Sequence, residues 1–189
     1  MNDFIFQNPT KVYFGKDQLK HLGEEILKYG DSVLLAYGGG SLKRSGLYDR
    51  ILAVLKEAGI RVFELPGVEP NPRSTTVNRG AAICRQNGIT ALLAVGGGST
   101  IDCCKGIAAL VPSEADDVWD LISGKIKYSS ALPVIAMPTA ASTGSEMDKS
   151  CQIANTELGV KSGLSSDLIR PRCAFHLLGA PPPDRLRRL

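Results

Sequence analysis

The sequence predicts an α/β fold in which a doubly wound, mainly parallel β-sheet is covered by helices on both faces. Two observations carry this prediction. Short apolar runs, typical of buried strands, alternate with stretches in which apolar residues recur at helical spacing. Two of these runs, SVLLAY and ALLAV, pass directly into glycine triplets, and a helical stretch follows each triplet. The length of 189 residues suits one such domain.

The first half of the chain supplies strands and helices in alternation. Residues 11–15 predict a short strand. Residues 17–29 predict a helix with four apolar side chains on its inner stripe, namely Leu19, Leu22, Ile26 and Leu27. A buried strand, a helix that stops at Gly59, a further strand and a loop are then expected over residues 32–37, 46–58, 61–65 and 66–72.

The second half continues this alternation and then departs from it. We expect a helix, a buried strand, a helix and a strand over residues 74–86, 91–95, 100–110 and 133–137, with a loop around Trp119. Residues 150–154 and 159–164 suggest two short strands joined by a polar turn, as in a hairpin. The end holds three consecutive prolines and lacks periodicity. We therefore expect a domain over residues 1–176 and an irregular tail over residues 177–189.

Composition bounds the class of protein. The apolar fraction of 43% and charged fraction of 22% are ordinary for a globular protein. No apolar run approaches the length that spans a bilayer, and the N-terminus lacks a signal-peptide pattern, so we expect a cytoplasmic protein with no membrane partner. The net charge of +3 comes from an arginine-rich segment after Ile169, which is short and without interleaved aromatic residues, so no nucleic-acid binding is predicted. The five cysteines form no C-x-x-C pair and are expected to be reduced and mostly buried.

The two glycine triplets are candidate anion-binding loops. A loop without Cβ atoms lets backbone N–H groups approach a diphosphate, and the following helix offers its N-terminal N–H groups to the same anion. Neither loop, Gly38–Ser41 or Gly96–Ser99, matches the G-x-G-x-x-G or the G-x-x-x-x-G-K-[ST] pattern. A tight turn alone would also explain each triplet, and both interpretations stay open at this point.

The segment that follows the second triplet reads GGGSTIDCCK and allows two interpretations. In one, Ser99 caps the helix and Asp102 completes a capping box. In the other, Gly97, Gly98 and Ser99 contact a pyrophosphate while Asp102 faces ribose or nicotinamide. Lys105 either adds positive charge to this site or is merely solvated. A third loop, PTAASTGSEM over residues 138–147, is rich in hydroxyl groups and follows a predicted strand of the same sheet.

Several motifs in unbroken order make the sequence similar to iron-containing (group III) alcohol dehydrogenases, and most closely to their butanol-dehydrogenase-like branch. The resemblance covers about residues 1–175. It is carried by NPTK at 8–11, FGK at 14–16, YGGGS at 37–41, PNP at 70–72, Gly96–Ser99 with Asp102 and Lys105, PT at 138–139, TGSEM at 143–147, Lys161 and PR at 171–172. Glycerol dehydrogenases and dehydroquinate synthases share this first domain, but the TGSEM segment favours the butanol-type branch.

The resemblance implies a Rossmann-like, dehydroquinate-synthase-like N-terminal domain that binds a nicotinamide cofactor, in an enzyme that reduces aldehydes or oxidises alcohols by hydride transfer. It implies that Gly97, Gly98 and Ser99 hold the pyrophosphate and that Asp102 and Lys161 approach the nicotinamide ribose. Thr139, Ser142 and Thr143 would line the adenine and ribose side. The remaining predicted cofactor-binding residues are Gly38, Gly39, Gly40, Ser41 and Asn71.

The first loop bears on the choice of cofactor. NAD-preferring dehydrogenases often place a carboxylate where it accepts a hydrogen bond from the ribose 2′-OH and repels a 2′-phosphate. The matching position here is Gly39, Ser41 can donate to a phosphate, and Lys43 and Arg44 follow. We therefore expect NADP(H) to be preferred over NAD(H).

The family's chemistry implies Fe²⁺ or Zn²⁺, held by one aspartate and three histidines in and just before a helical C-terminal domain. This chain has two histidines, His21 and His176, so we predict no metal ligands and no catalytic residues within it, and expect the metal domain to be missing. The break after Phe175 suggests the hypothesis of a shifted reading frame or a premature end. Two functions remain open. One is part of an alcohol dehydrogenase acting on a small alcohol or aldehyde, with a homodimer possible. The other is a non-catalytic truncated dinucleotide-binding module or gene remnant.

Overall fold

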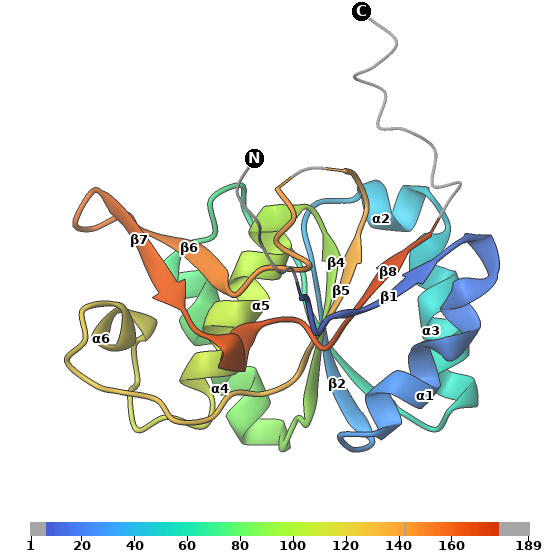
Figure 1. The fold of residues 1–189 in the computed structure, drawn as a ribbon, viewed down its shortest axis with the longest axis horizontal. Coiled ribbons are helices and arrows are strands. Elements are labelled where there is room, and N and C mark those ends of the chain that lie inside the picture. The colour runs from blue at the N-terminus through green and yellow to red at the C-terminus, as the bar shows by residue number, and fades with distance from the viewer. Residues whose placement is uncertain (1–6, 142, 178–189) are drawn as a thin grey trace, which may run out of the picture.

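A computed structural model describes residues 7–141 and 143–177. The centre of the molecule is a six-stranded, wholly parallel sheet (Figure 1), which confirms the predicted fold class. The strand order is β3–β2–β4–β5–β8–β1. The strands span Lys11–Phe14 (β1), Ser32–Tyr37 (β2), Arg61–Leu65 (β3), Ala91–Gly96 (β4), Val134–Pro138 (β5) and Cys173–His176 (β8).

Helices cover both faces of this sheet (Figure 1). On one face lie the 3₁₀ helix η1 (Lys16–His21) and the helices α1 (Leu22–Leu27), α2 (Ser41–Arg44) and α3 (Leu47–Glu57). On the other lie α4 (Ser74–Asn87), α5 (Gly98–Leu110), α6 (Val118–Ile122) and the 3₁₀ helix η2 (Asp167–Ile169). Successive side chains of each central strand therefore enter two different cores: Leu34 packs on the α4–α5 side and Leu35 on the α1–α3 side.

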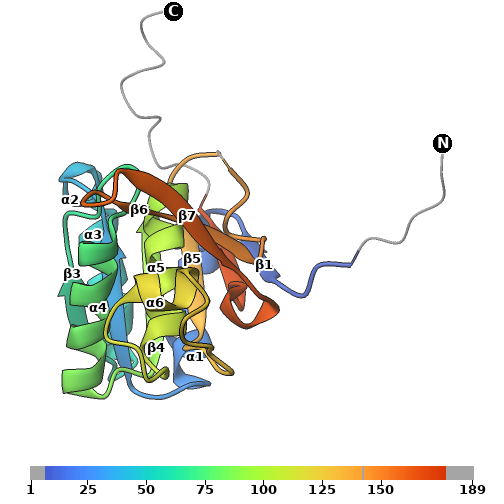
Figure 2. The same cartoon turned by 90° about the vertical axis from the view of Figure 1, so that its left-hand side faces the viewer.

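The predicted hairpin is confirmed. Strands β6 (Ser150–Asn155) and β7 (Val160–Ser165) pair antiparallel in a separate two-stranded sheet. Figure 2 shows this hairpin running alongside α5. Cys151 and Ile153 on β6 bury their side chains in the core on the α4–α5 side, so the hairpin is anchored against the central helix of that layer.

Three local predictions differ from the structure. The helix expected over residues 17–29 consists of a 3₁₀ segment and a short α-helix. Leu27, the last residue of α1, lies about 100° around the helix from the buried Ile26, and 48% of it is exposed. The loop expected around Trp119 contains α6, whose N-terminus is capped by Asp117: the Asp117 side chain accepts a hydrogen bond from the Trp119 N–H. The sequence did not predict this helix because it is too short to show a helical period. The first glycine triplet enters the short helix α2, which a left-handed Gly46 separates from α3.

Strand β8 was not predicted, because it shows only three consecutive apolar residues after Pro171. It lies between β1 and β5, with which it pairs over long sequence separations.

All five cysteines are free thiols with buried side chains, and the sequence predicted reduced thiols that are mostly buried. The irregular tail predicted for residues 177–189 lies outside the described residues except for Leu177. In the part of the chain that the structure describes, no helix is long and apolar enough to cross a membrane.

Candidate functional site

The three predicted loops meet at one edge of the sheet, where the carboxyl ends of β2, β4 and β5 lie side by side (Figure 1). From β2 the chain passes through α3 to β3, and it then returns through α4, on the opposite face, to β4 on the other side of β2. This reversal of direction is the position at which open α/β sheets bind ligands. A cavity of about 210 Å³ opens here, lined by residues of all three loops: Gly38, Gly39, Ser41, Leu42, Ser45, Leu47, Val95, Gly96, Gly97, Thr100, Thr139 and Ala140.

The second loop combines open space with a helix N-terminus. Helix α5 begins at Gly98, and a Cβ atom on the preceding Gly97 would have no protein atom within 4 Å. A Cβ on Gly98 would lie 2.5 Å from Oγ1 of Thr143, so the third loop lies directly over the start of this helix. An anion in the cavity would therefore meet the backbone at Gly97 without an intervening side chain, beside the Thr143 hydroxyl.

The predicted capping box is wrong. Because α5 begins one residue before Ser99, this serine lies inside the first turn and no side chain caps the helix. The Ser99 Oγ instead accepts a hydrogen bond of 3.2 Å from the backbone N–H of Asn71. Asp102 forms its hydrogen bonds outside its own helix, with Ser145 and Gln152. Both side chains are thus directed to neighbouring segments, and the capping interpretation no longer explains them.

Asn71 and Lys161 are brought together although 90 positions separate them. The Lys161 Nζ on β7 donates to Oδ1 of Asn71 over 2.7 Å, and Asn71 adopts a left-handed backbone with φ of 56°. Both residues are exposed at the rim of the site. The hairpin therefore reaches the loop that precedes α4 and is linked through Asn71 to Ser99 at the start of α5.

Lys105 is a buried group of this site. Its exposed fraction is 0%, so the alternative of a merely solvated lysine is wrong. The ammonium donates to Oγ of Ser145 at 3.0 Å, to Oδ1 of Asp148 at 2.6 Å and to the carbonyl of Ser150 at 2.7 Å. Ser145 in turn donates to Oδ1 of Asp102 at 2.6 Å. Sequence reasoning placed Asp102 at the site but gave no role to Ser145 or Asp148.

Asp102 has a second donor on its other side. The backbone N–H of Gln152 donates to its Oδ2 at 3.0 Å. Burial raises the pKa of Asp102, while the hydrogen bonds from Ser145 and Gln152 and the charge of Lys105 oppose that rise. The carboxylate is thus oriented by α5, by the third loop and by β6 at the same time.

The first loop lies beside a tyrosine–carboxylate cluster that the sequence did not reveal. Glu64 on β3 accepts hydrogen bonds from the hydroxyls of Tyr37 (2.5 Å) and Tyr48 (2.7 Å). The Lys43 ammonium lies 4.6 Å from the centre of the Tyr48 ring. Burial raises the pKa of Glu64, but the two phenol hydrogen bonds outweigh it and the net shift is downward. The hydrogen bond to Glu64 is the main cause that raises the pKa of Tyr48 to about 12.

The other predicted site residues are placed as follows. Gly40 lies against Arg44, whose Nη1 would be 3.0 Å from a Cβ at that glycine. Ser41 begins α2 and lines the cavity. The backbone N–H of Thr139 donates to the Gly96 carbonyl over 3.0 Å, which joins the second and third loops. Ser142 lies outside the described residues.

Neither histidine belongs to a metal-binding cluster in the described part of the chain, where no three His, Cys, Asp or Glu side chains gather suitably. His21 stacks on the Tyr13 ring, with ring centres 5.2 Å apart. Nε2 of His176 lies 3.7 Å from the Glu146 carboxylate. The residues that the structure describes therefore do not fit the Fe²⁺ or Zn²⁺ that the sequence resemblance implies.

Comparison with known proteins agrees with this arrangement. The family profile described as iron-containing alcohol dehydrogenase matches residues 9–176. The chain belongs to the iron-containing alcohol dehydrogenase family. It is 50% identical over 172 residues to NADH-dependent butanol dehydrogenase A of Clostridium acetobutylicum, and the match covers 91% of this chain and 44% of that protein. It is 38% identical over 173 residues to the NADPH-dependent aldehyde reductase YqhD of Escherichia coli, covering 90% of this chain and 44% of that protein.

A solved structure of NADH-dependent butanol dehydrogenase A from Thermotoga maritima matches this fold with a TM-score of 0.86 and 38% identity. The match covers 93% of this chain and 44% of that structure. The butanol-dehydrogenase-like branch and the N-terminal position of the match are thereby confirmed. The chain spans less than half the length of the curated relatives that it matches.

Proposed function

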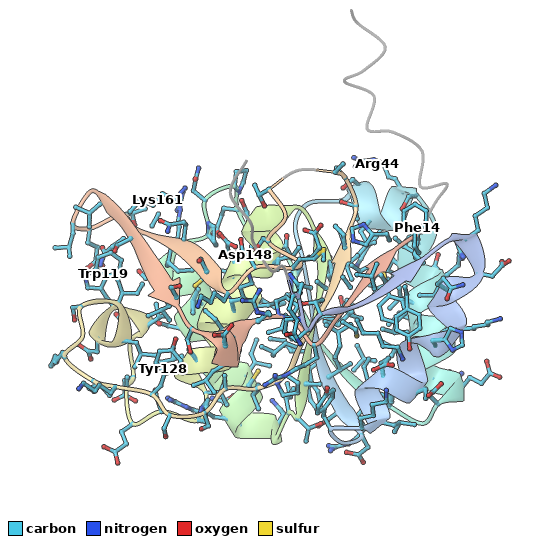
Figure 3. The ribbon with its side chains drawn as sticks, in the orientation of Figure 1. Phe14, Arg44, Trp119, Tyr128, Asp148 and Lys161 are labelled. Carbon is cyan, nitrogen blue, oxygen red and sulfur yellow. The ribbon has the colours of Figure 1, made fainter. Side chains whose placement is uncertain are left out.

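We propose that this chain binds a nicotinamide dinucleotide across the edge of the sheet, with the pyrophosphate at the N-terminus of α5. The observation that carries the proposal is the cavity where the three loops meet, into which Gly97 presents backbone with no side chain in the way. Figure 3 places Arg44 and Lys161 on opposite sides of this upper edge, so each nucleoside half would have its own basic side chain.

Each loop would contribute a different part of the cofactor site. Gly97, Gly98 and Ser99 would contact the pyrophosphate, with Thr143 beside the start of α5, and the first loop with Thr139 would surround the adenosine half. Asp102, Asn71 and Lys161 would approach the nicotinamide ribose. The hydrogen bond between Lys161 and Asn71 supports this assignment of the two cofactor halves, because Lys161 lies on the hairpin side of the sheet edge, away from α2.

The direct test is isothermal titration of the purified chain with NADPH and with NADH. We expect a single site for at least one of them, and mutually exclusive binding of the two. No heat of binding with either dinucleotide, from a chain whose circular dichroism shows a folded α/β protein, would refute the proposal.

We further infer that NADP(H) is preferred over NAD(H). Gly39 carries no carboxylate, Ser41 lines the cavity, and Arg44 lies against Gly40, so the loop itself offers a 2′-phosphate donors and no repelling charge. The neighbouring Glu64 carboxylate is engaged by the hydroxyls of Tyr37 and Tyr48. The names of four relatives at 47–51% identity all contain the words NADH-dependent, and the aldehyde reductase at 38% identity is described as NADPH-dependent. Tighter binding of NADH than of NADPH in the same titration would refute this inference.

For the whole protein we propose hydride transfer between this cofactor and a small alcohol or aldehyde. A divalent metal would polarise the substrate oxygen in that reaction, but the described residues provide no cluster to hold it. The second candidate is a dinucleotide-binding module without catalysis of its own. NADPH oxidation with butanal and added Fe²⁺ or Zn²⁺ separates the two, since turnover by this chain alone would exclude the non-catalytic module.

A further inference from the structure

Lys105 is fully buried, with an exposed fraction of 0%. Removing an ammonium group from water is strongly unfavourable unless its charge and its three N–H donors are matched. All three donors are matched here, by a hydroxyl, a carboxylate and a carbonyl. The matched ammonium therefore ties the centre of α5 to the segment that it contacts.

All three partners of Lys105 lie in one segment, residues 145–150, which leads from the third loop into β6. Figure 3 shows Asp148 of this segment near the middle of the molecule, below the edge where the loops meet. Asp148 also accepts from the backbone N–H of Ser150 at 2.8 Å, which closes the turn. The ammonium thus clamps a compact turn onto α5.

The hydrogen bonds around Ser145 have a fixed direction. A lysine ammonium only donates and a carboxylate only accepts, so the Ser145 hydroxyl must accept from Lys105 and donate to Asp102. Asp102 lies one helical turn before Lys105 on the same helix. The serine therefore transmits the position of the ammonium to the carboxylate that faces the proposed nicotinamide ribose.

The same segment sets two further contacts at the site. Thr143, two residues before Ser145, lies against Gly98 at the start of α5, and its Oγ1 accepts from the Ser145 N–H over 3.3 Å. Strand β6, which follows Ser150, pairs with β7, and β7 carries Lys161 to Asn71. Displacement of the clamped turn would therefore move Asp102 and the hairpin on the nicotinamide side, together with Thr143 at the pyrophosphate end of α5, and leave the first loop unchanged.

We propose that Lys105 is a positioning residue for the nicotinamide half of the cofactor site, acting through Ser145 on Asp102 and through the 145–150 turn on the hairpin. This inference rests on the proposed function. It predicts a loss of affinity confined to one half of the dinucleotide, because the adenosine half meets the first loop on the other side of the edge.

The test compares a whole cofactor with its adenine-side fragment. Wild type, Lys105→Met and Ser145→Ala are titrated calorimetrically with the cofactor that binds more tightly, NADPH or NADH, and with the matching fragment, 2′,5′-ADP or 5′-ADP. We expect Kd for the cofactor to rise about tenfold in Lys105→Met and about threefold in Ser145→Ala, while Kd for the fragment stays within about twofold. The emission of bound reduced nicotinamide should shift toward that of the free cofactor in both variants.

Ser150→Ala is the matched control. It removes a hydroxyl from the same turn, but Lys105 uses the carbonyl of Ser150 and not its hydroxyl, so neither affinity should change. If Lys105→Met does not fold by circular dichroism, Ser145→Ala carries the test, because it keeps the ammonium and its two other partners. Equal weakening of cofactor and fragment, or no weakening of either, would overturn the proposal. A folded wild type that binds neither ligand would instead overturn the proposed function beneath it.

Discussion

Gly97 is a residue at which a substitution should change cofactor affinity without changing the stability of the fold. It has an extended backbone that any residue adopts, and a Cβ there would touch nothing within 4 Å. Gly97→Ala should leave the thermal midpoint within about 1 °C of wild type, yet its methyl group would enter the cavity and weaken dinucleotide binding at least about tenfold. Thermal unfolding and titration on the same sample measure both quantities.

Gly124 provides the opposite case as a control. A Cβ there also has open space, but φ is 76°, a left-handed backbone that alanine adopts at a cost of about 1 kcal/mol. Gly124 lies at the end of α6 and does not line the cavity. Gly124→Ala should therefore lower stability and leave affinity unchanged, and the same pattern for both variants would contradict the assignment of Gly97.

Glu25 on α1 makes stability depend on pH. Its Oε1 accepts from Lys11 and Lys28, both at 2.7 Å, and from the Tyr13 hydroxyl. Burial alone would raise the pKa of Glu25, but these hydrogen bonds outweigh it and lower the pKa from 4.5 to about 2. A lowered pKa means that the stabilisation is present above about pH 4.5 and is lost as the pH falls toward 2.

Glu25→Gln should accordingly destabilise the protein by about 1–2 kcal/mol at pH 7, because both lysines are half exposed and solvent screens part of the interaction. Urea unfolding of variant and wild type should show this difference shrinking below pH 4.5. The neighbouring, exposed Glu24 provides the control, since Glu24→Gln should change stability by less than about 0.5 kcal/mol. A difference that is constant from pH 7 to pH 3 would contradict the role of Glu25.

At the scale of elements, the sequence predicted those whose stability is mostly local. The buried run SVLLAY has the predicted bounds of β2, and two short strand-like runs on either side of a polar turn identified β6 and β7. Elements that depend on distant partners were missed, such as β8, which is held by pairing with β1 more than 150 positions away. Short helices were also missed, because α2 and α6 contain too few residues to show a period.

The residues of the candidate site also fall into those that the sequence could predict and those that depend on distant partners. Glycine loops after apolar strands are visible in the sequence, so the three loops and Asp102 could be predicted. The burial of Lys105 could not, because a lysine on a helix is ordinarily solvated and its three partners lie 40 or more positions away. Glu64 was missed for a similar reason, since its partners Tyr37 and Tyr48 belong to a neighbouring strand and helix.

A substitution at Gly163 tests whether β6 and β7 pair as the structure describes. A Cβ at this position would collide with the backbone carbonyl of Cys151 on the paired strand, and a backbone atom cannot move aside as a flexible side chain can. Gly163→Ala should part the strands, lower the thermal midpoint by about 5 °C or more and accelerate amide exchange in β6 and β7. Ser162→Ala, at the exposed neighbouring position, should do neither. Unchanged exchange in Gly163→Ala would mean that the hairpin is not paired as described.

For the whole molecule, the open edge of the sheet determines how copies of the chain would meet. Among the described residues, β1 pairs with a strand on one side only. It also exposes two apolar side chains, Val12 at 43% and Phe14 at 64%, of which Phe14 is labelled in Figure 3. An exposed apolar edge strand is a template for pairing with another chain. The homodimer that the sequence left open therefore becomes a proposal in which the β1 strands of two copies lie together.

Sedimentation velocity over a range of protein concentrations measures this association. We expect wild type to shift toward a dimer as concentration rises and Phe14→Lys to remain monomeric, because a charge on the open edge opposes both burial and pairing. Leu158→Lys is the matched control, since Leu158 is also 61% exposed but lies in the turn between β6 and β7. Cofactor affinity should be the same in both variants, because neither position lines the cavity. If Leu158→Lys abolishes association and Phe14→Lys does not, the contact lies on the hairpin and the β1 edge is excluded as the dimer interface.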